Sequence, residues 1–198
     1  MAKIGLYFGS FNPVHIGHMA IAGYMTEFTG LDEVWFVVSP HNPLKNKETL
    51  LSDHHRLYMV QIAIGDSYRL KASDIEFKLP LPSYTIDTLT YLSEKYNKNK
   101  FCLVMGEDNL NTLHKWKNAG ELVAEYPIYV YPRRDSLKPE STLLDQLLLN
   151  AEIHPVNAPL MEISATFIRN GIKNGRDLSF FLPAAVWKYI REMHFYER

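Results

Sequence analysis

The stretch from Gly9 to His18 most constrains what this chain can fold into. It follows the apolar run 4–8, which is typical of a buried strand, and leads into residues 19–22, which are typical of a helix start. A strand, a glycine turn and a helix N-terminus form an anion site, because unpaired backbone N–H groups converge there with the positive end of the helix dipole. His15 and His18 add side-chain donors. The stretch therefore predicts a phosphate-binding turn.

Strand-like and helix-like segments alternate along the rest of the chain. Apolar, β-branched and aromatic runs predict further strands at 33–39, within 70–79, and at 100–105, 128–131 and 151–154. Helical patterns lie at 52–65 with Asp53 as a cap, from 83 with Ser83 or Thr85 as a cap, and at 143–149, 163–169 and 183–193. This alternation predicts an α/β fold with a doubly wound, mostly parallel sheet and helices on both faces.

The composition limits the number of domains, the classes of partner and the kinds of metal site that this chain can have. The 198 residues, 46% of them hydrophobic, fit a single domain spanning 1–198. A net charge of −1 argues against a partner that is a nucleic acid or a membrane. The single Cys102 excludes a disulfide framework and a cysteine-based metal cluster. We therefore expect a cytoplasmic protein without a metal site of its own, and the sequence leaves a homo-oligomer open.

A second candidate phosphate site lies near the end of the chain. Ser164 is a suitable N-cap, and Thr166, Arg169 and Lys173 fall on one face of the helix that follows. A hydroxyl and a guanidinium at a helix N-terminus provide charge-assisted donors for a phosphate. A capped surface helix here, and a turn with two surface histidines at the first site, are the purely structural alternatives.

Both stretches resemble signatures of one superfamily. His15-Ile16-Gly17-His18 after Gly9-Ser10-Phe11-Asn12-Pro13, and Ile163-Ser164-Ala165-Thr166-Phe167-Ile168-Arg169, are similar to motifs of the nucleotidyltransferases. These enzymes transfer a nucleoside monophosphate from ATP or CTP to a phosphate acceptor. The resemblance implies a Rossmann-like nucleotidyltransferase fold in which the two motifs bind one triphosphate from opposite sides.

Four further segments resemble the bacterial type of nicotinate-nucleotide adenylyltransferase. They are Pro40-x-x-Pro43-x-Lys45, Ser83-Tyr84-Thr85-x-Asp87-Thr88-Leu89, Gly106-x-Asp108-x-Leu110 and Trp116, and the likeness runs from residue 5 to about residue 190. It implies that Lys45 and Thr85 approach the acceptor mononucleotide, that Trp116 packs near its pyridine ring, and that Asp108 lies by the ATP ribose. Without the resemblance, each residue also has a purely structural explanation. Trp116 could pack in the core, Lys45 and Arg134 could be solvated surface charges, and Asp108 could cap a helix.

The resemblance implies transfer of AMP from ATP to nicotinate mononucleotide, with Mg²⁺ carried by ATP. Neither a general base nor a protein nucleophile is evident, so we expect catalysis by alignment and charge neutralisation, with His15, His18, Lys45 and Arg169 as catalytic donors. The expected ATP site comprises Gly9, Ser10, Phe11, His15, His18, Gly106, Asp108, Ser164, Thr166 and Arg169. The expected mononucleotide site comprises Asn42, Lys45, Thr85, Trp116 and Arg134.

Three positions depart from the family pattern: Ser10, Asn12 and Leu44 stand where relatives often have Gly, Asp and His. We expect these differences to affect the conformation of the loops and the affinity for the acceptor. Adenylyl transfer to nicotinamide mononucleotide or to phosphopantetheine, and a non-catalytic nucleotide sensor on the same scaffold, remain alternatives. The histidine at position 15 and the 83–89 segment argue against the phosphopantetheine reaction.

Overall fold

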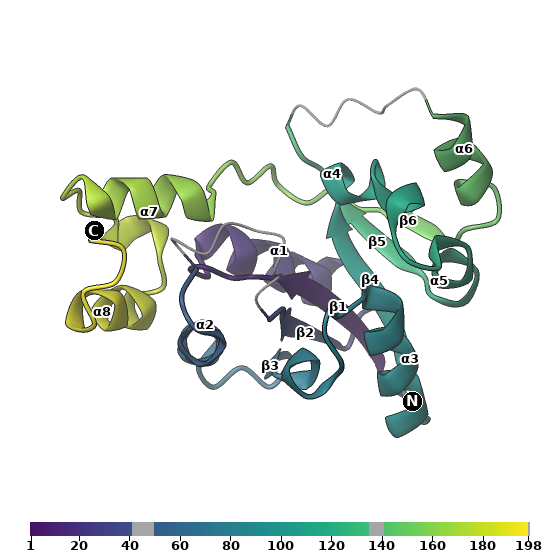
Figure 1. Cartoon of the computed structure of the whole chain (residues 1–198), viewed down its shortest axis with the longest axis horizontal. Helices are drawn as coiled ribbons and strands as arrows, with labels where there is room; N and C mark the ends of the chain where they lie inside the picture. Colours follow the sequence, from purple (N-terminus) through teal and green to yellow (C-terminus); the bar gives the residue numbers. More distant parts are fainter. Residues whose placement is uncertain (41–49, 135–140, 198) are drawn as a thin grey trace.

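A six-stranded parallel sheet forms the centre of the molecule in the computed structural model, which describes residues 1–40, 50–134 and 141–197 (Figure 1). Every strand pair in these ranges is parallel, as the sequence predicted. The strands are β1 Lys3–Gly9, β2 Glu33–Val38, β3 Leu70–Ser73, β4 Lys100–Gly106, β5 Ile128–Tyr131 and β6 Ile153–Pro155.

The strands are arranged in the order β3-β2-β1-β4-β5-β6. The chain therefore builds outward from β1 in one direction and then returns to place β4 on its other side. In open α/β sheets, a ligand crevice forms outside the carboxyl ends of the strands at such a reversal. This places the expected site between the turn after β1 and the end of β4.

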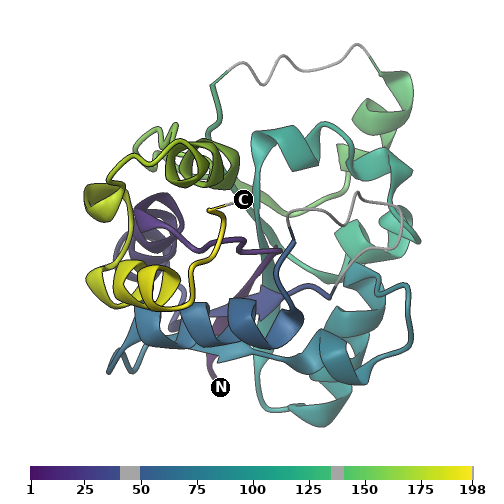
Figure 2. The same ribbon diagram turned by 60° about the vertical axis from the view of Figure 1, so that its left-hand side comes forward.

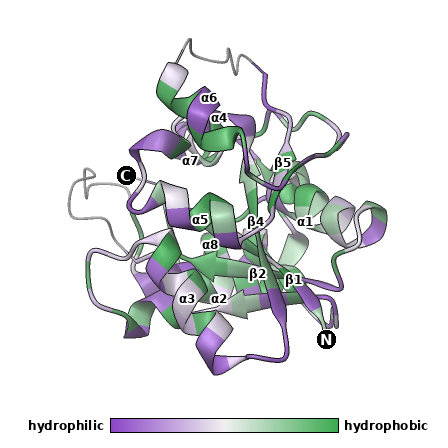
Figure 3. Ribbon diagram, turned by 90° about the vertical axis from the view of Figure 1, so that its right-hand side faces the viewer, coloured by the Kyte–Doolittle hydropathy of each residue, from purple (hydrophilic) through white to green (hydrophobic). Residues whose placement is uncertain are grey.

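Helices cover both faces of this sheet. They are α1 Ile16–Phe28, α2 Asp53–Ile64, α3 Thr85–Lys95, α4 Glu107–Leu110, α5 Ala119–Glu125, α6 Thr142–Leu148, α7 Ala165–Lys173 and α8 Ala184–Glu192. One buried cluster joins the sheet to α1, α2, α7 and α8, and a second joins its other face to α3, α5 and α6. Figure 3 shows the apolar residues gathered in the strands at the centre. The doubly wound prediction is confirmed.

Alternation within the strands explains the two clusters. In β1, Tyr7 belongs to the first cluster, whereas Ile4 and Leu6 belong to the second. Successive side chains of a strand point to opposite faces, so a central strand buried on both sides is apolar almost throughout. In the described residues, no helix is long and apolar enough to cross a membrane.

Several element boundaries differ from the sequence predictions. The 70–79 region is a four-residue strand followed by a 3₁₀ helix, Ile75–Lys78. Tyr84, rather than Ser83 or Thr85, is the N-cap of α3, and Ser52, rather than Asp53, is the N-cap of α2. The helices α4 and α5 and the 3₁₀ helices Leu113–Lys115 and Ser179–Phe181 were not predicted. Segments of three to seven residues carry too little periodicity to be recognised in the sequence.

Candidate functional site

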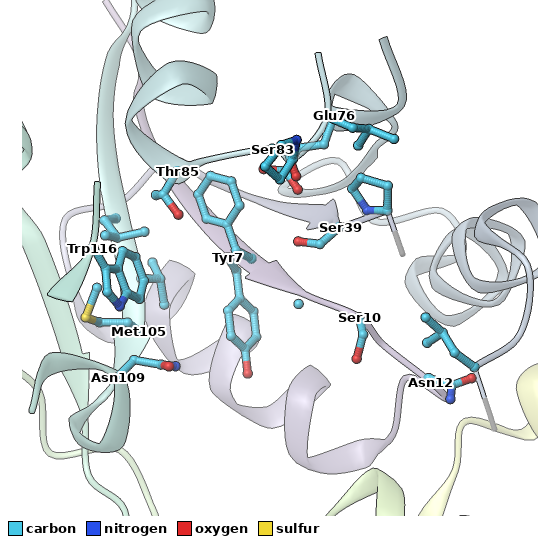
Figure 4. A pocket seen from close by; sticks show the side chains of 18 of the residues that line it. Tyr7, Ser10, Asn12, Ser39, Glu76, Ser83, Thr85, Met105, Asn109 and Trp116 are labelled. Atoms are coloured by element: carbon cyan, nitrogen blue, oxygen red, sulfur yellow. The ribbon is translucent and has the colours of Figure 1, made fainter. Parts of the chain in front are cut away.

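A cavity of about 470 Å³ opens at the carboxyl ends of β1 and β4, where the strand order reverses. Side chains from several separate segments surround it, as Figure 4 shows. They include Tyr7, Ser10, Asn12, Ser39, Glu76, Ser83, Thr85, Met105, Asn109 and Trp116. Arg169 also lines the cavity. The cavity therefore combines parts of the first and last predicted motifs with the predicted acceptor segment.

The turn between β1 and α1 forms one wall of this cavity. Phe11 is buried and has a left-handed φ of 44°. Its ring lies so close to Gly9 that a Cβ on Gly9 would come within 2.9 Å of it. A residue with a side chain at position 9 would displace the ring, so glycine is required here by close packing.

The two predicted phosphate motifs meet at this turn. Arg169 of α7 donates from Nη1 to the backbone carbonyl of Asn12 at 2.8 Å, across 157 positions of sequence. Its Nη2 lies 3.2 Å from Thr166 Oγ1, and Ser164 caps α7 by accepting from the Phe167 N–H at 3.1 Å. The prediction that the early turn and the late helix fold together is confirmed.

The imidazoles of His15 and His18 stack on each other at the start of α1. Their ring centroids are 3.7 Å apart with an interplanar angle of 28°. The backbone N–H of His15 donates to Nδ1 of His18 at 3.2 Å. A neutral His18 that accepts at Nδ1 carries its proton on Nε2, so its other ring nitrogen is a hydrogen-bond donor.

Both histidines are neutral at pH 7. Burial, with a smaller effect of the nearby Arg133 charge, lowers the pKa of His15 from its ordinary value of 6.5 to about 4. Burial, His15 and Arg133 together lower the pKa of His18 well below its ordinary value. The imidazoles therefore offer neutral N–H donors, and the positive charge of this region comes from arginines.

Arg133 provides such a charge, and it was not predicted from the sequence. Its Nη1 donates to the Met161 carbonyl at 3.3 Å, and its guanidinium lies over the Tyr131 ring, 5.2 Å from the centroid. Side chains alternate along a strand, so Arg133 continues the side of β5 that Tyr129 and Tyr131 occupy in the cluster with α1. The spacing of two residues between Tyr129, Tyr131 and Arg133 was the feature of the sequence that could have indicated this position.

The structure does not bring Arg134, the arginine that the sequence analysis selected, to the cavity. Its side chain is 69% exposed and pairs with Glu162 at 2.7 Å. Arg134 lies in the turn beyond β5 and extends to Glu162, whereas Arg133 lies over the Tyr131 ring. Arg134 and Arg133 therefore have different surroundings despite their identical chemistry.

Arg56 is a second arginine that the sequence analysis missed. Its side chain is completely buried and forms an ion pair with Asp53. It donates from Nη1 to the Ser10 carbonyl at 2.6 Å and from Nε to the Leu51 carbonyl at 3.0 Å. Position 56 shares the core face of α2 with Met59 and Val60, and a charge at a core-facing helical position was the sequence signal.

The predicted acceptor residues Thr85 and Trp116 both line the cavity. Thr85 is the first residue of α3, so unpaired backbone N–H groups of that helix start lie beside it. Asn42, Leu44 and Lys45 lie outside the described residues. The acceptor half of the site is thus described in part.

Glu76 is a buried carboxylate in this half of the cavity and was not anticipated. It accepts from Thr88 Oγ1 at 3.0 Å. Burial raises the pKa of Glu76 above its ordinary value, opposed by hydrogen bonds with Ser39, Thr88 and Ser83. Glu76 therefore connects the end of β2 with the start of α3, two segments that form adjacent walls of the cavity.

Gly106 ends β4, and Asp108 lies in α4 just beyond it. A Cβ on Gly106 would collide with the Asp108 carboxylate, so this glycine permits a close approach. Asp108 Oδ1 lies 3.8 Å from Arg133 Nε. Asp108 therefore lies beside Arg133, the charge that also lowers the pKa values of the two histidines.

Metal-ligating side chains do not gather in the described part of the chain. No group of three or more His, Cys, Asp or Glu side chains there is arranged to hold a metal ion. The polar side chains that line the cavity include the Arg169 guanidinium, hydroxyls, amides and the Glu76 carboxylate, and the two imidazoles lie at the adjoining start of α1. Guanidinium, imidazole, hydroxyl and backbone N–H groups suit phosphate oxygens.

Comparison with known proteins points to one family. The cytidylyltransferase-like family matches residues 6–171. The "Probable nicotinate-nucleotide adenylyltransferase" of Flavobacterium psychrophilum is 53% identical over 196 residues, which cover 99% of this chain and 100% of the relative. A protein of the same name from Bacteroides fragilis is 46% identical over 188 residues, 95% of this chain and 90% of the relative.

Solved structures agree on the fold. Plasmodium falciparum nicotinic acid mononucleotide adenylyltransferase in complex with NaAD superposes with a TM-score of 0.79 at 19% identity, covering 100% of this chain and 98% of the other. At this identity the likeness shows the fold alone. The sequence relatives carry the assignment: the chain belongs to the nicotinate-nucleotide adenylyltransferase family, within the cytidylyltransferase-like proteins.

Proposed function

We propose that this chain is a single-domain enzyme that transfers AMP from ATP to nicotinate mononucleotide, giving nicotinate adenine dinucleotide and pyrophosphate. The observation that carries the proposal is the hydrogen bond between Arg169 and the Asn12 carbonyl, at a cavity that also contains Thr85 and Trp116. A triphosphate site and an acceptor site would thereby adjoin at the point of strand reversal.

In this reaction a phosphate oxygen of the mononucleotide attacks the α-phosphorus of ATP. A new phosphorus–oxygen bond forms, and the bond to the oxygen that bridges the α- and β-phosphates breaks, so pyrophosphate leaves with the bonding electrons. The attacking phosphate is already an anion at neutral pH, so no protein base is needed. Catalysis then depends on alignment of two phosphates and on stabilisation of the charge that develops in the transition state.

We assign the ATP side to the turn after β1, the end of β4 and the start of α7. Its residues are Gly9, Ser10, Phe11, His15, His18, Gly106, Asp108, Ser164, Thr166 and Arg169. The neutral imidazole N–H groups donate to phosphate oxygens, and Arg169 adds a charged donor. Magnesium would arrive as part of the substrate, MgATP, and would offset the negative charge of the triphosphate.

We assign the acceptor side to Asn42, Lys45, Thr85 and Trp116. The nicotinate carboxylate is an anion, and the N-terminal N–H groups of α3 beside Thr85 would bind it. The indole of Trp116 would pack against the pyridine ring. An amide in place of the carboxylate lacks the charge that a helix N-terminus stabilises, so the acid is the expected acceptor.

The test is incubation with ATP, Mg²⁺ and one acceptor at a time, followed by mass spectrometry and a pyrophosphate assay. Nicotinate mononucleotide should give dinucleotide and pyrophosphate in equal amounts, at a higher rate than nicotinamide mononucleotide. Turnover with phosphopantetheine but with neither mononucleotide would contradict the proposed acceptor. ATP binding without pyrophosphate release for any acceptor would indicate a nucleotide sensor. A preference for the amide would overturn the assignment of the carboxylate to α3.

A further inference from the structure

The segment that follows α8 returns to the turn after β1. Figure 2 shows the chain beyond α8 running back toward the start of α1. His194 and Tyr196 both have left-handed φ angles, 53° and 65°, which non-glycine residues adopt only rarely. The Phe195 ring packs edge-on against His55 with a centroid distance of 4.8 Å. This segment is thus held in one particular conformation against α2.

That conformation brings Tyr196 to Asn12. The Tyr196 hydroxyl donates to Asn12 Oδ1 at 2.7 Å, across 184 positions of sequence. The backbone N–H of Leu51 donates to the same oxygen at 3.3 Å. Asn12 is 4% exposed, so its side chain is fixed by these two donors inside the protein.

Asn12 is also the residue whose backbone carbonyl holds Arg169, at 2.8 Å from Nη1. One residue therefore connects the Tyr196 hydroxyl, through its side chain, with the Arg169 guanidinium, through its backbone. Arg169 and Asn12 both line the cavity.

The hydroxyl is a donor over the whole physiological range. Burial raises the pKa of Tyr196 above its ordinary value, and the facing charges of Arg169 and Arg56 oppose this shift only in part. The phenol therefore stays protonated beside two arginines and keeps its hydrogen bond to Asn12.

We propose that Tyr196 is a positioning residue of the ATP site: its hydroxyl fixes the Asn12 side chain, and the fixed Asn12 holds its carbonyl where Arg169 meets the triphosphate. The inference rests on the proposed adenylyl transfer and adds to it a residue near the far end of the chain. Removal of the hydroxyl should loosen the turn after β1 and weaken interactions with ATP, whereas the acceptor half around Trp116 should be unaffected.

The test compares Tyr196→Phe with Tyr189→Phe. Tyr189 is a matched control because its hydroxyl also makes one hydrogen bond, 2.8 Å from His55 Nδ1, and both rings pack against Phe195. Tyr189→Phe therefore disturbs the same segment while the bond from Tyr196 to Asn12 remains. For Tyr196→Phe we expect the KM for ATP to rise about three- to tenfold, the effect of one hydrogen bond, with the KM for nicotinate mononucleotide unchanged. Tyr189→Phe should alter neither KM.

A double-mutant cycle with Asn12→Ala identifies the route of the effect. If Tyr196 acts through the Asn12 side chain, adding Tyr196→Phe to Asn12→Ala should change the KM for ATP no further. Additive effects, an unchanged KM for ATP in Tyr196→Phe, or an equal change in Tyr189→Phe would overturn the proposal. A merely structural role would lower the melting temperature without this split between the two KM values.

Binding of a non-hydrolysable ATP analogue, measured by calorimetry, gives a readout that does not require turnover. Lack of turnover by the unaltered enzyme would contradict the proposed function alone. The positioning role is then decided by the dissociation constant of the analogue, which should rise in Tyr196→Phe and stay unchanged in Tyr189→Phe.

Discussion

At the scale of single residues, the histidines of the site are neutral hydrogen-bond donors, and its positive charge lies on arginines. The stacked pair His15 and His18 is neutral at pH 7, because burial and Arg133 lower both pKa values. Arg133 and Arg169 carry the positive charge. A neutral donor costs less to bury than a charged one, so two imidazoles can sit inside the turn and still bond a phosphate that enters.

His18→Ala should lower kcat by about 10²–10³, the range for the loss of one transition-state donor. Steady-state kinetics with ATP and nicotinate mononucleotide measures this. His154→Ala is the control, because His154 lies on the outer strand β6 and pairs with Glu152. Wild-type turnover in His18→Ala would remove His18 from the mechanism.

His15 should make the protein less stable in mild acid. Its pKa is 6.5 unfolded and about 4 folded, so between these values the unfolded chain binds more protons and the unfolding free energy falls as pH falls. At about 1.4 kcal/mol for each pH unit, this loss approaches about 3 kcal/mol near pH 4. Urea unfolding at several pH values measures it.

The comparison for this measurement is His15→Gln, which cannot titrate. Its unfolding free energy should fall less steeply than that of the unaltered protein between pH 6.5 and pH 4. Parallel pH profiles for the two proteins would show that His15 titrates normally in the folded state.

At the scale of elements, local pattern predicted the strand, turn and helix around residues 4–28 and the capped helix at Ser164. Both predictions rest on neighbours within a few positions of each other in sequence. The contacts of Arg56 with Ser10 and of Tyr196 with Asn12 join residues far apart in sequence. No periodicity encodes such a contact, which is why the sequence predicted the motifs but missed the residues that hold them in place.

Ser164→Ala should lower the unfolding free energy by about 1 kcal/mol, because it removes the N-cap hydrogen bond of α7. Ser141→Ala, which removes the corresponding bond of α6, is the matched control and should cost a similar amount. Chemical denaturation measures both. Since α7 carries Arg169, only Ser164→Ala should also raise the KM for ATP, and an equal rise in Ser141→Ala would contradict this.

At the scale of the whole molecule, the strand order puts the ends of β1 and β4 side by side and so determines where the cavity lies. The sequence predicted the sheet type, because alternating strands and helices leave few other arrangements. It placed Thr85 and Trp116 at the cavity through the family resemblance. It predicted Arg134 rather than Arg133 for the site. These adjacent arginines have the same chemistry and both lie beyond β5, so only tertiary contacts distinguish them.

An ATP analogue should stabilise the whole fold, because its triphosphate would bind residues from both ends of the chain. At a hundred times its dissociation constant, we expect the unfolding free energy to rise by about 2.7 kcal/mol. Urea unfolding with and without the analogue measures this. Adenosine, which lacks phosphates, is the comparison, and equal stabilisation by adenosine at the same concentration would contradict a site dominated by phosphate contacts.

The hydrogen bonds that Asn12 makes with Arg169 and Tyr196 also set an order of events during synthesis. A ribosome makes the turn after β1 more than 150 positions before it makes the side chains that hold this turn. A nascent chain containing only β1, α1 and β2 has neither Arg169 nor Tyr196. We therefore expect growing chains to acquire affinity for ATP late, when α7 and the segment beyond α8 have emerged.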